Sequence, residues 1–288
     1  MVAAVLPVRS AVTSQFMPAA PYLGQNATMH VAVNDFHIPY HDQRLMVEFK
    51  KFVHTHQPRV IHILGDLLDC YAVSKFSKDP ARLLSLQDEF DQGTEFLREL
   101  RELCPSTIIS FVEGNHEARL QKFLCSQAPQ LKSLRCLDVR QQLKLAENRI
   151  WWWAENSFYR WKHLFYTHGL YVRKHSGVAA KEHFEQFGGC VIHGHGHRFG
   201  TYYRTTLRDT FACWENGCMA DPKQQDYCPI ANWQQGWSVV WHIGNRFHVD
   251  QIVVIDGAYV YHGKEYGVAE PSGDFRRMPD MAEMSLSV

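Results

Sequence analysis

The stretch VIHILGDLLD at residues 60–69 opens with a short run of mostly β-branched residues and ends in a glycine and two aspartates. Such a run is typical of a buried strand, and the glycine indicates a turn directly after it. Two other runs show the same pattern. The run at residues 29–33 continues into NDFH, and the run at residues 107–112 continues into EGNH. The chain therefore predicts three strands that each end in a polar loop.

Amphipathic segments separate these three strands. Apolar residues at Leu45, Phe49 and Phe52 recur with a period of about 3.6 residues, which predicts a helix over residues 42–54. A second helix is expected over residues 81–103. The order strand, helix, strand, helix, strand is the signature of a parallel sheet covered by helices.

The second half of the chain predicts a further set of strands. Aromatic-rich runs at residues 149–153, 157–159 and 163–166 indicate an antiparallel meander. The remaining expected elements are a helix at 177–187 and strands near 190–192, 202–206, 238–242 and 247–255. We therefore expect an α/β fold in which two sheets face each other with helices outside. The expected organisation is a flexible arm at 1–27, one domain at 28–263 and a frayed polar tail at 264–288.

Composition favours a soluble globular protein. Apolar residues make up 45% of the 288 residues and charged residues 21%, which is typical of such proteins. The 30 basic and 30 acidic residues balance, so net charge argues neither for nor against nucleic acid or membrane surfaces. No apolar run approaches the roughly 18 to 20 residues of a membrane span, and we expect a cytoplasmic protein. The eight cysteines form no Cys-x-x-Cys pair and are expected to stay reduced.

Metal-ligand residue types follow five of the predicted strands. They are Asp35 and His37, Asp66, Asn115 and His116, His168, and finally His195 and His197. A single ending of this kind is more often a turn or a helix cap. In open α/β sheets, however, ligands bind outside the carboxyl ends of the strands, so five such endings predict one shared metal site.

These segments together resemble the five signature motifs of the calcineurin-like metallophosphoesterases. The motifs are Asp35-x-His37, Gly65-Asp66-x-x-Asp69, Gly114-Asn115-His116-Glu117, His168-Gly169 and Gly194-His195-x-His197. A weaker resemblance to small phage and bacterial members rests on residues 214–218 and 232–237. The resemblance implies an α/β/β/α sandwich with a centre of two divalent metal ions between the strand ends.

The resemblance also implies a role for each site residue. The first metal would be held by Asp35, His37, Asp66 and His197, and the second by Asp66, Asn115, His168 and His195. Two cations about 3.5 to 4 Å apart need a shared anion, which suits Asp66 as the bridge. His116 would assist the leaving group, and Asp69 would orient this histidine.

The ligand types narrow the choice of metal and reaction. Mixed imidazole and oxygen donors suit Mn²⁺, our first expectation, or Fe, Zn²⁺ or Ni²⁺. A pair of such ions lowers the pKa of a bound water and clamps phosphate oxygens, so that a hydroxide attacks phosphorus in line. The expected function is therefore hydrolysis of a phosphate ester.

The sequence says less about which ester is cleaved. Protein phosphatases of this superfamily follow the second motif with Arg-Gly, whereas Cys70 and Tyr71 follow Asp69 here, which disfavours a phosphopeptide. Residues 119–174 hold eleven Lys or Arg against three acids, with aromatics interleaved, which mildly favours a nucleic acid or nucleotide diester. A core hairpin with a basic exposed face explains the same pattern. Phosphate-binding cations are expected among Arg119, Arg173, Lys174 and Arg198.

Three alternatives stay open. A phosphomonoesterase or protein phosphatase would use the same centre, and a non-catalytic scaffold would keep the fold to bind partners. Structural zinc held by the scattered cysteines would need about four sulfurs per ion. The sequence does not specify the oligomeric state.

Overall fold

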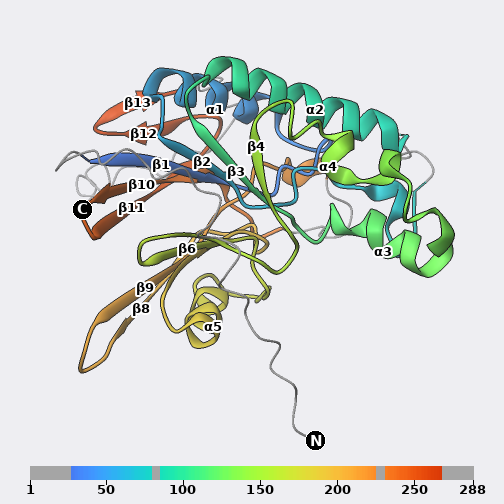
Figure 1. Cartoon of the computed structure of the whole chain (residues 1–288). Coiled ribbons are helices and arrows are strands. Elements are labelled where there is room, and N and C mark those ends of the chain that lie inside the picture. Colours follow the sequence, from blue (N-terminus) through green and yellow to red (C-terminus); the bar gives the residue numbers. More distant parts are fainter. Residues whose placement is uncertain (1–26, 80–84, 225–230, 268–288) are drawn as a thin grey trace, which may run out of the picture.

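The computed structural model describes residues 27–79, 85–224 and 231–267. Its layers are helices α1 (Gln43–His56) and α2 (Leu86–Leu103), a six-stranded sheet, a five-stranded sheet and helix α5 (Val178–Phe187), as Figure 1 shows. This is the predicted sandwich of two sheets with helices outside. The expected arm up to residue 26, residues 81–84 of the second helix and the tail from residue 268 lie outside the described residues.

The six-stranded sheet has the strand order β11-β10-β1-β2-β3-β4. Its strands are β1 (Thr28–Val33), β2 (Val60–Ile63), β3 (Ile108–Val112), β4 (Ile150–Trp153), β10 (Gln235–Ile243) and β11 (Arg246–Val254). Strands β1 to β4 are parallel, whereas β10 pairs antiparallel with both β1 and β11. The carboxyl ends of the four parallel strands therefore meet at one edge.

The five-stranded sheet has the order β5-β6-β7-β9-β8. Its strands are β5 (Tyr159–Trp161), β6 (Leu164–Thr167), β7 (Cys190–His193), β8 (Gly200–Thr205) and β9 (Thr210–Glu215). Strands β6, β7 and β9 are parallel, with β5 and β8 antiparallel at the edges. A separate pair consists of β12 (Tyr259–Tyr261) and β13 (Lys264–Tyr266).

The remaining helices are short. They are α3 (Ala118–Gln127), α4 (Val139–Gln142) and 3₁₀ turns at Tyr71–Val73, Pro129–Leu131, Arg135–Leu137 and Pro222–Gln224. The predicted helix at residues 42–54 is α1, and Asp42 caps it. The Oδ1 atom of Asp42 accepts hydrogen bonds from the backbone N–H groups of Arg44 and Leu45 at 2.9 and 3.1 Å. This cap satisfies two of the N–H groups that a helix start leaves without partners.

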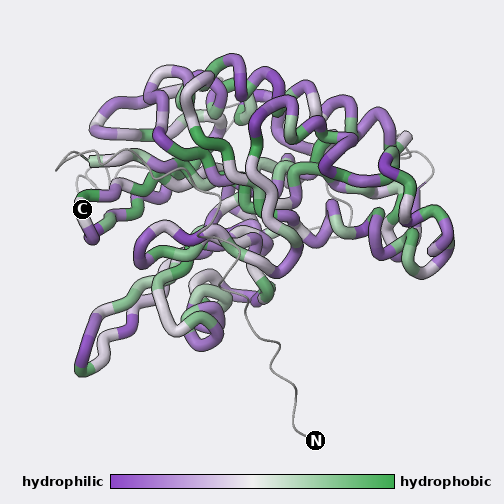
Figure 2. The backbone as a smooth tube through the Cα atoms, in the orientation of Figure 1, coloured by the Kyte–Doolittle hydropathy of each residue, from purple (hydrophilic) through white to green (hydrophobic). Residues whose placement is uncertain are grey.

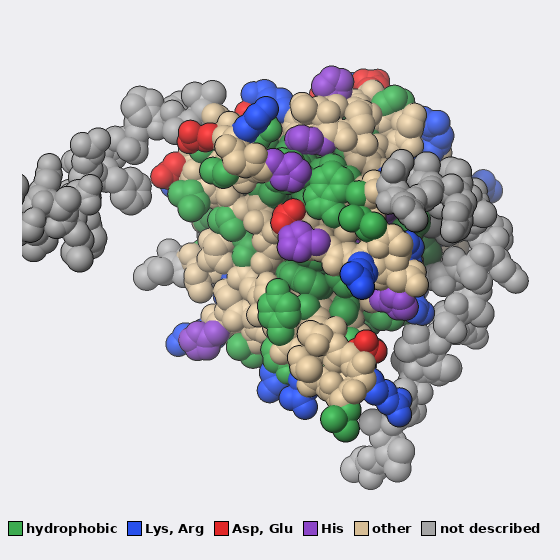
Figure 3. All heavy atoms as spheres, turned by 90° about the vertical axis from the view of Figure 1, so that its left-hand side faces the viewer, with side chains coloured by type: hydrophobic (Ala, Val, Ile, Leu, Met, Phe, Trp, Pro, Cys, Tyr) green, Lys and Arg blue, Asp and Glu red, His purple; other side chains and the backbone are tan. Residues whose placement is uncertain are grey.

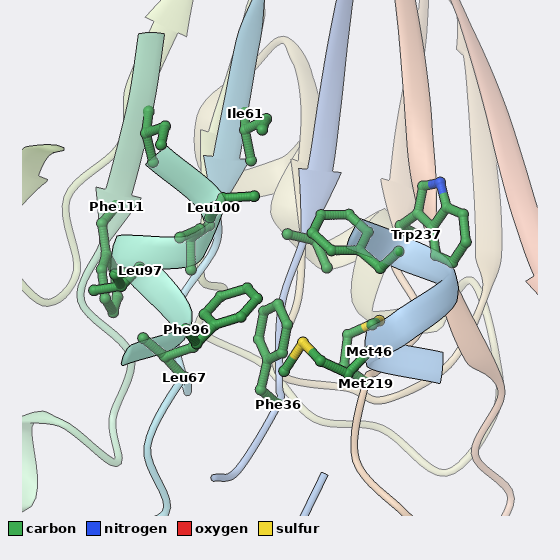
Figure 4. Packing of buried hydrophobic residues seen from close by; sticks show 14 of the residues in the cluster. Phe36, Met46, Ile61, Leu67, Phe96, Leu97, Leu100, Phe111, Met219 and Trp237 are labelled. Atoms are coloured by element: carbon green, nitrogen blue, oxygen red, sulfur yellow. The ribbon is translucent and has the colours of Figure 1, made fainter. Parts of the chain in front are cut away.

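Both faces of the central strands are buried. Val31 and Ile61 pack on α1 and α2, whereas Ala32 and Leu64 pack against the five-stranded sheet. Figure 4 shows side chains from α2, including Phe96 and Leu100, beside those of the sheet. In Figure 2 the central strands are largely hydrophobic, whereas the outer helices alternate between hydrophobic and hydrophilic residues. This alternation follows from strands that lie between two covering layers.

The predicted antiparallel meander is wrong for its first strand. β4 pairs in parallel with β3, with Ile150 opposite Ile109, and so belongs to the six-stranded sheet. An apolar run indicates a strand but not its neighbour. Here the Arg101 side chain of α2 donates to the carbonyls of Asn148 and Arg149 at 2.8 and 3.1 Å, which holds the chain beside the first sheet. Only β5 and β6 form the expected antiparallel pair.

The start of the polar tail also differs from the expectation. Residues 264–266 form β13, and Tyr266 stacks on Tyr259 with 5.2 Å between ring centroids. Because Tyr259 belongs to the core, this contact keeps the chain ordered past residue 264. The polar composition of the segment conceals its pairing with β12 and the aromatic contact of Tyr266.

A polar layer lies between the two sheets. The Nδ1 atom of His30 is 3.1 Å from Nε2 of His62, and Nε2 of His242 is 3.0 Å from the Tyr166 hydroxyl. Burial, reinforced by neighbouring positive groups, lowers the pKa of all three histidines, that of His242 to about 4. All three imidazoles are therefore neutral at pH 7.

Candidate metal centre

The loops after five strands converge at one edge of the sandwich. They are the loops after β1, β2, β3, β6 and β7, and they carry Asp35, His37, Asp66, Asn115, His116, His168, His195 and His197. Ligand atoms gather within 4.8 Å of one another in three groups: Asp35, His37 and His197; His37, Asp66 and His116; and Asp66, His168 and His195. Because His37 and Asp66 each belong to two groups, the three groups form one continuous cluster.

The backbone at this cluster is left-handed at non-glycine residues. This conformation occurs at Asp35, His37, Asp66, His195 and His197, with φ from 50° to 69°. Each such residue costs about 1–3 kcal/mol and persists only where its surroundings impose the conformation. Hydrogen bonds between the first two loops do so, since the N–H groups of Asp35 and His37 donate to the carbonyls of Gly65 and Asp66, both at 3.0 Å.

The first group is built around two facing imidazoles. The Nε2 atoms of His37 and His197 are 3.1 Å apart, and Oδ1 of Asp35 is 3.4 Å from Nε2 of His197. His37 donates its Nδ1–H to Oδ1 of Asp69 at 3.0 Å, so its Nε2 carries the lone pair. The Oδ2 atom of Asp35 accepts the N–H of His195 at 2.8 Å, whereas its buried Oδ1 has no hydrogen-bond partner among the described residues.

In the third group, acceptors surround His168. This residue donates Nδ1–H to the Leu64 carbonyl at 2.7 Å. Its Nε2 then faces Oδ1 of Asn115 at 2.9 Å and Oδ2 of Asp66 at 3.4 Å. Burial lowers the pKa of His168, but Asp66 and Asp35 outweigh it and raise the pKa to about 10. The geometry therefore calls for a positive charge, a proton or a metal ion, among these three side chains.

This donor set fits divalent metal ions. The free lone pairs and carboxylate oxygens of the two groups face inward, and burial lowers the pKa of His195 to about 4, which leaves its imidazole neutral. Neutral imidazole and carboxylate oxygen are common partners of transition metals. Asp66 belongs to the middle and the third group, and its Oδ2 is 3.9 Å from Nε2 of His37 and 3.4 Å from Nε2 of His168, a position that suits a bridging carboxylate.

His116, in the middle group, lies beside the predicted ligands and is held by Asp69. Its Nδ1 is 3.0 Å from both the Oδ1 atom and the backbone carbonyl of Asp69. Burial raises the pKa of Asp69, but hydrogen bonds from His116 and His37 outweigh it and hold the pKa below its usual range. Arg119 donates to Nε2 of His116 and to the Asp69 carbonyl, both at 2.8 Å. Of the four predicted phosphate-binding cations, Arg119 is thus brought to the site.

Glu117 clamps two loops together, a role that the sequence did not reveal. Its buried carboxylate accepts the N–H groups of Asp66, Leu68 and Gly114 at 3.0, 2.8 and 2.9 Å. Burial, reinforced by Asp66, raises the pKa of Glu117 to about 8. Gly114 permits this close approach, since a Cβ there would lie 2.1 Å from Oδ1 of Asp66. In the sequence, the position of Glu117 directly after His116 was the feature that could have indicated this role.

A buried amide network supports Asp35 from behind. Asn34 donates from Nδ2 to the Asp35 carboxylate and to the Gly217 carbonyl. Asn216 donates to Oδ1 of Asn34, and its own Oδ1 accepts from the Ser238 hydroxyl, both at 2.6 Å. The segment at residues 214–218, singled out in the sequence by resemblance alone, thus helps to place a candidate ligand.

The other predicted cations lie apart from the cluster. Arg173 forms an ion pair with Glu182 at 2.7 Å, and Arg198 donates to the Arg173 carbonyl at 2.5 Å. Lys174 is exposed. Within the described part of the chain, none of these three cations bonds to a cluster residue.

Most aromatic residues of the basic segment are buried or partly buried, whereas Phe123 and Trp151 are exposed. Trp152 contacts Phe111 with ring centroids 5.0 Å apart, and Trp161 contacts His30 at 4.9 Å. Figure 3 shows the face at the left of Figure 1, on which Lys and Arg side chains are spread out; helices α3 and α4 of the basic segment lie at the right of Figure 1, away from this face. These contacts agree with the core hairpin and not with a groove of stacking aromatics.

The cysteines offer no second metal site in the described residues. The seven that the structure describes are free thiols, and none belongs to a group of three candidate ligands there. The zinc alternative therefore has no support in this part of the chain.

Across the residues that the structure describes, every helix is too short or too polar to cross a membrane.

Comparison with known proteins gives one family. The sequence model of the calcineurin-like phosphoesterases matches residues 31–263. Gene 54 proteins of Mycobacterium phages D29 and L5 are each 26% identical to the chain, over 263 and 269 residues, and each alignment covers 83% of this chain and 98% of the relative. Wild-type Vps29 from Entamoeba histolytica, solved with Zn²⁺, aligns with a TM-score of 0.43 and 13% identity, over 84% of this chain and 98% of that one. Because the family model spans most of the chain, the protein belongs to the calcineurin-like phosphoesterases.

Proposed function

We propose that the protein hydrolyses phosphodiesters of the nucleotide type with the help of two divalent metal ions, Mn²⁺ first among them. The ligands would be Asp35, His37, Asp66, Asn115, His168, His195 and His197. One observation supports this most strongly: a cluster of inward-facing imidazoles and carboxylates with a tethered histidine, His116, beside it.

When bound, the two ions would polarise the phosphate oxygens and make a water molecule a stronger nucleophile. The protein's own side chains set the geometry for that chemistry. Asp66 would join the two halves of the centre, while Glu117 fixes the Asp66 backbone and Asn34 fixes Asp35. Preorganised groups of this kind need no rearrangement during the reaction.

His116 would pass a proton to the leaving oxygen. Because Asp69 holds its Nδ1–H, the Nε2 atom is the one free to act toward a substrate. In the free protein Nε2 accepts from Arg119. In the substrate complex the Arg119 guanidinium would turn to a phosphate oxygen, and Nε2 would carry the proton that the leaving group takes.

Hydrolysis of chromogenic substrates tests this function. With Mn²⁺ the protein should turn over a chromogenic diester faster than a monoester or a phosphopeptide. Asp66→Asn should lower diester turnover at least about a thousandfold, because the bridging charge is lost. Asp91→Asn, the same change on an exposed carboxylate of α2, should leave the rate unaltered. Cleavage of the phosphopeptide alone would instead favour a protein phosphatase.

A binding scaffold is the second candidate. The intact ligand set argues against it, since a scaffold has no need for seven converging ligands and a tethered His116. Metal bound in full but no turnover of any phosphate ester would favour the scaffold.

A further inference from the structure

A pocket of about 300 Å³ opens beside the proposed second metal. On one side it is lined by Asn115, His168 and His195. On the other side it is lined by Glu155, Asn156 and Leu170. Among the described residues that line it there is neither His116 nor Arg119. A group seated in this pocket would therefore be the part of the ester that stays on phosphorus, not the leaving group.

The size of the pocket sets the size of this group. Small-molecule sites span roughly 300 to 1,000 Å³, so this pocket is at the lower end of the range. A single sugar and base is a suitable occupant. In a strand that continues beyond this nucleoside, the next phosphate would lie in the pocket or at its mouth.

The charge of the pocket opposes a second phosphate. Glu155 is the acidic residue among those that line the pocket, and its carboxylate is paired with the Lys122 ammonium at 2.5 Å. The carboxylate is the more buried partner, with 24% of the side chain exposed against 59% for Lys122. A phosphate in the pocket would thus lose water and face a like charge, which costs binding free energy. A hydroxyl or amino group would instead find an acceptor.

We propose that this pocket selects an uncharged group of nucleoside size through Glu155, so that the protein acts on small or terminal nucleotide diesters rather than on internal positions of a nucleic acid strand. The inference rests on the proposed function and names the substrate class of the same site. It also agrees with the packing of Trp152 and Trp161 described above.

A matched pair of substrates tests the proposal. The first is the p-nitrophenyl ester of thymidine 5′-phosphate, and the second is the same ester with an added 3′-phosphate. In both, p-nitrophenolate leaves and thymidine stays on phosphorus. With Mn²⁺ we expect kcat/KM for the 3′-phosphorylated ester to be at least about tenfold lower. Calorimetric binding of thymidine 5′-phosphate and thymidine 3′,5′-bisphosphate should show the same order.

Two variants show whether the pocket excludes the 3′-phosphate by its charge or by its size. In Glu155→Gln, kcat/KM for the two esters should differ by less than about threefold, because the carboxylate charge that repels the 3′-phosphate is gone. Lys122→Met should enlarge the ratio of kcat/KM between the two esters, because the Glu155 carboxylate loses its counter-ion. Glu147→Gln, an exposed carboxylate outside the pocket, should keep the wild-type ratio.

Equal or faster cleavage of the 3′-phosphorylated ester by the wild-type protein would overturn the proposal. So would an identical ratio in the Glu155 and Lys122 variants, since a limit set only by size would leave both unchanged. Failure of the proposed function looks different, because then neither thymidine ester nor bis(p-nitrophenyl) phosphate would be cleaved with Mn²⁺.

Discussion

The Nε2 atoms of His37 and His197 lie 3.1 Å apart, although 160 positions separate the two residues in the sequence. Nδ1 of His37 is committed to Asp69, so this ring offers a lone pair to its partner. Two imidazole nitrogens at this distance share a proton or face a common cation. The unpartnered Oδ1 of Asp35, 3.4 Å from His197, favours the cation.

Metal binding should therefore stabilise the fold. We expect millimolar Mn²⁺ to raise the melting temperature by several degrees, since a ligand at about 100 times its Kd adds about 2.7 kcal/mol. Excess chelator should reverse the shift. His197→Ala should reduce the shift, whereas His54→Ala, on the exposed face of α1, should not. If Mn²⁺ did not change the melting temperature of the wild-type protein, the proposed metal site would be contradicted.

Asp69→Asn should slow diester hydrolysis about 10- to 100-fold. Asp69 touches both His37 and His116, so its loss loosens a candidate ligand and the candidate proton donor together. The measurement is kcat at saturating Mn²⁺, with bound metal determined on the same sample. Wild-type kcat in this variant would show that Asp69 does not orient His116.

Glu117→Ala should destabilise the protein by at least about 3 kcal/mol. The change leaves three buried N–H groups without an acceptor, each costing about 1–3 kcal/mol. Urea unfolding of the metal-free protein measures the difference. The matched change Glu147→Ala, at an exposed position, should stay within about 0.5 kcal/mol of wild type. If Glu117→Ala also changed the free energy of unfolding by less than about 0.5 kcal/mol, Glu117 would not hold the two loops together.

The layer of buried histidines should make the fold sensitive to acid. Burial holds the pKa of His30 and His62 well below the unfolded value near 6.5, and lowers that of His242 to about 4. Between these values the unfolded chain binds more protons, so the free energy of unfolding falls as pH drops through the window from about 6.5 to 4.

A phenylalanine at His62 should flatten this dependence. Removing one histidine that takes up a proton on unfolding lowers the slope of the free energy of unfolding against pH by up to about 1.4 kcal/mol per pH unit. Urea unfolding at pH 7, 6 and 5 gives the slopes for His62→Phe and for the exposed control His54→Phe. Equal slopes in both variants and wild type would mean that His62 is not neutral in the folded state.

The sequence was informative where strands end. Each ligand loop follows a short apolar strand, so the order of β1, β2 and β3 with their helices, and the meeting of Asp35, Asp66 and Asn115, could be predicted from period and topology. The left-handed backbone at Asp35 and Asp66 could not, because it arises from hydrogen bonds between loops rather than from either residue type.

Supporting carboxylates were the main omission. Glu89 of α2 is 1% exposed and accepts the Cys70 N–H at 2.6 Å, which fixes the loop beside Asp69. In the sequence Glu89 is one of several acids on an amphipathic helix, and its burial depends on the neighbouring loop. The place of β4 beside β3 likewise depends on distant contacts, since Arg101 of α2 holds the chain just before it and Trp152 packs on Phe111 of β3.

Anomalous scattering from crystals grown with Mn²⁺ tests the two-metal centre most directly. We predict two peaks, one bounded by Asp35, His37 and His197 and the other by Asn115, His168 and His195, with the Asp66 carboxylate touching both. Crystals of Asp66→Asn should lose at least one peak. A wild-type crystal with no peak at these side chains, or with its manganese elsewhere, would contradict the proposed centre.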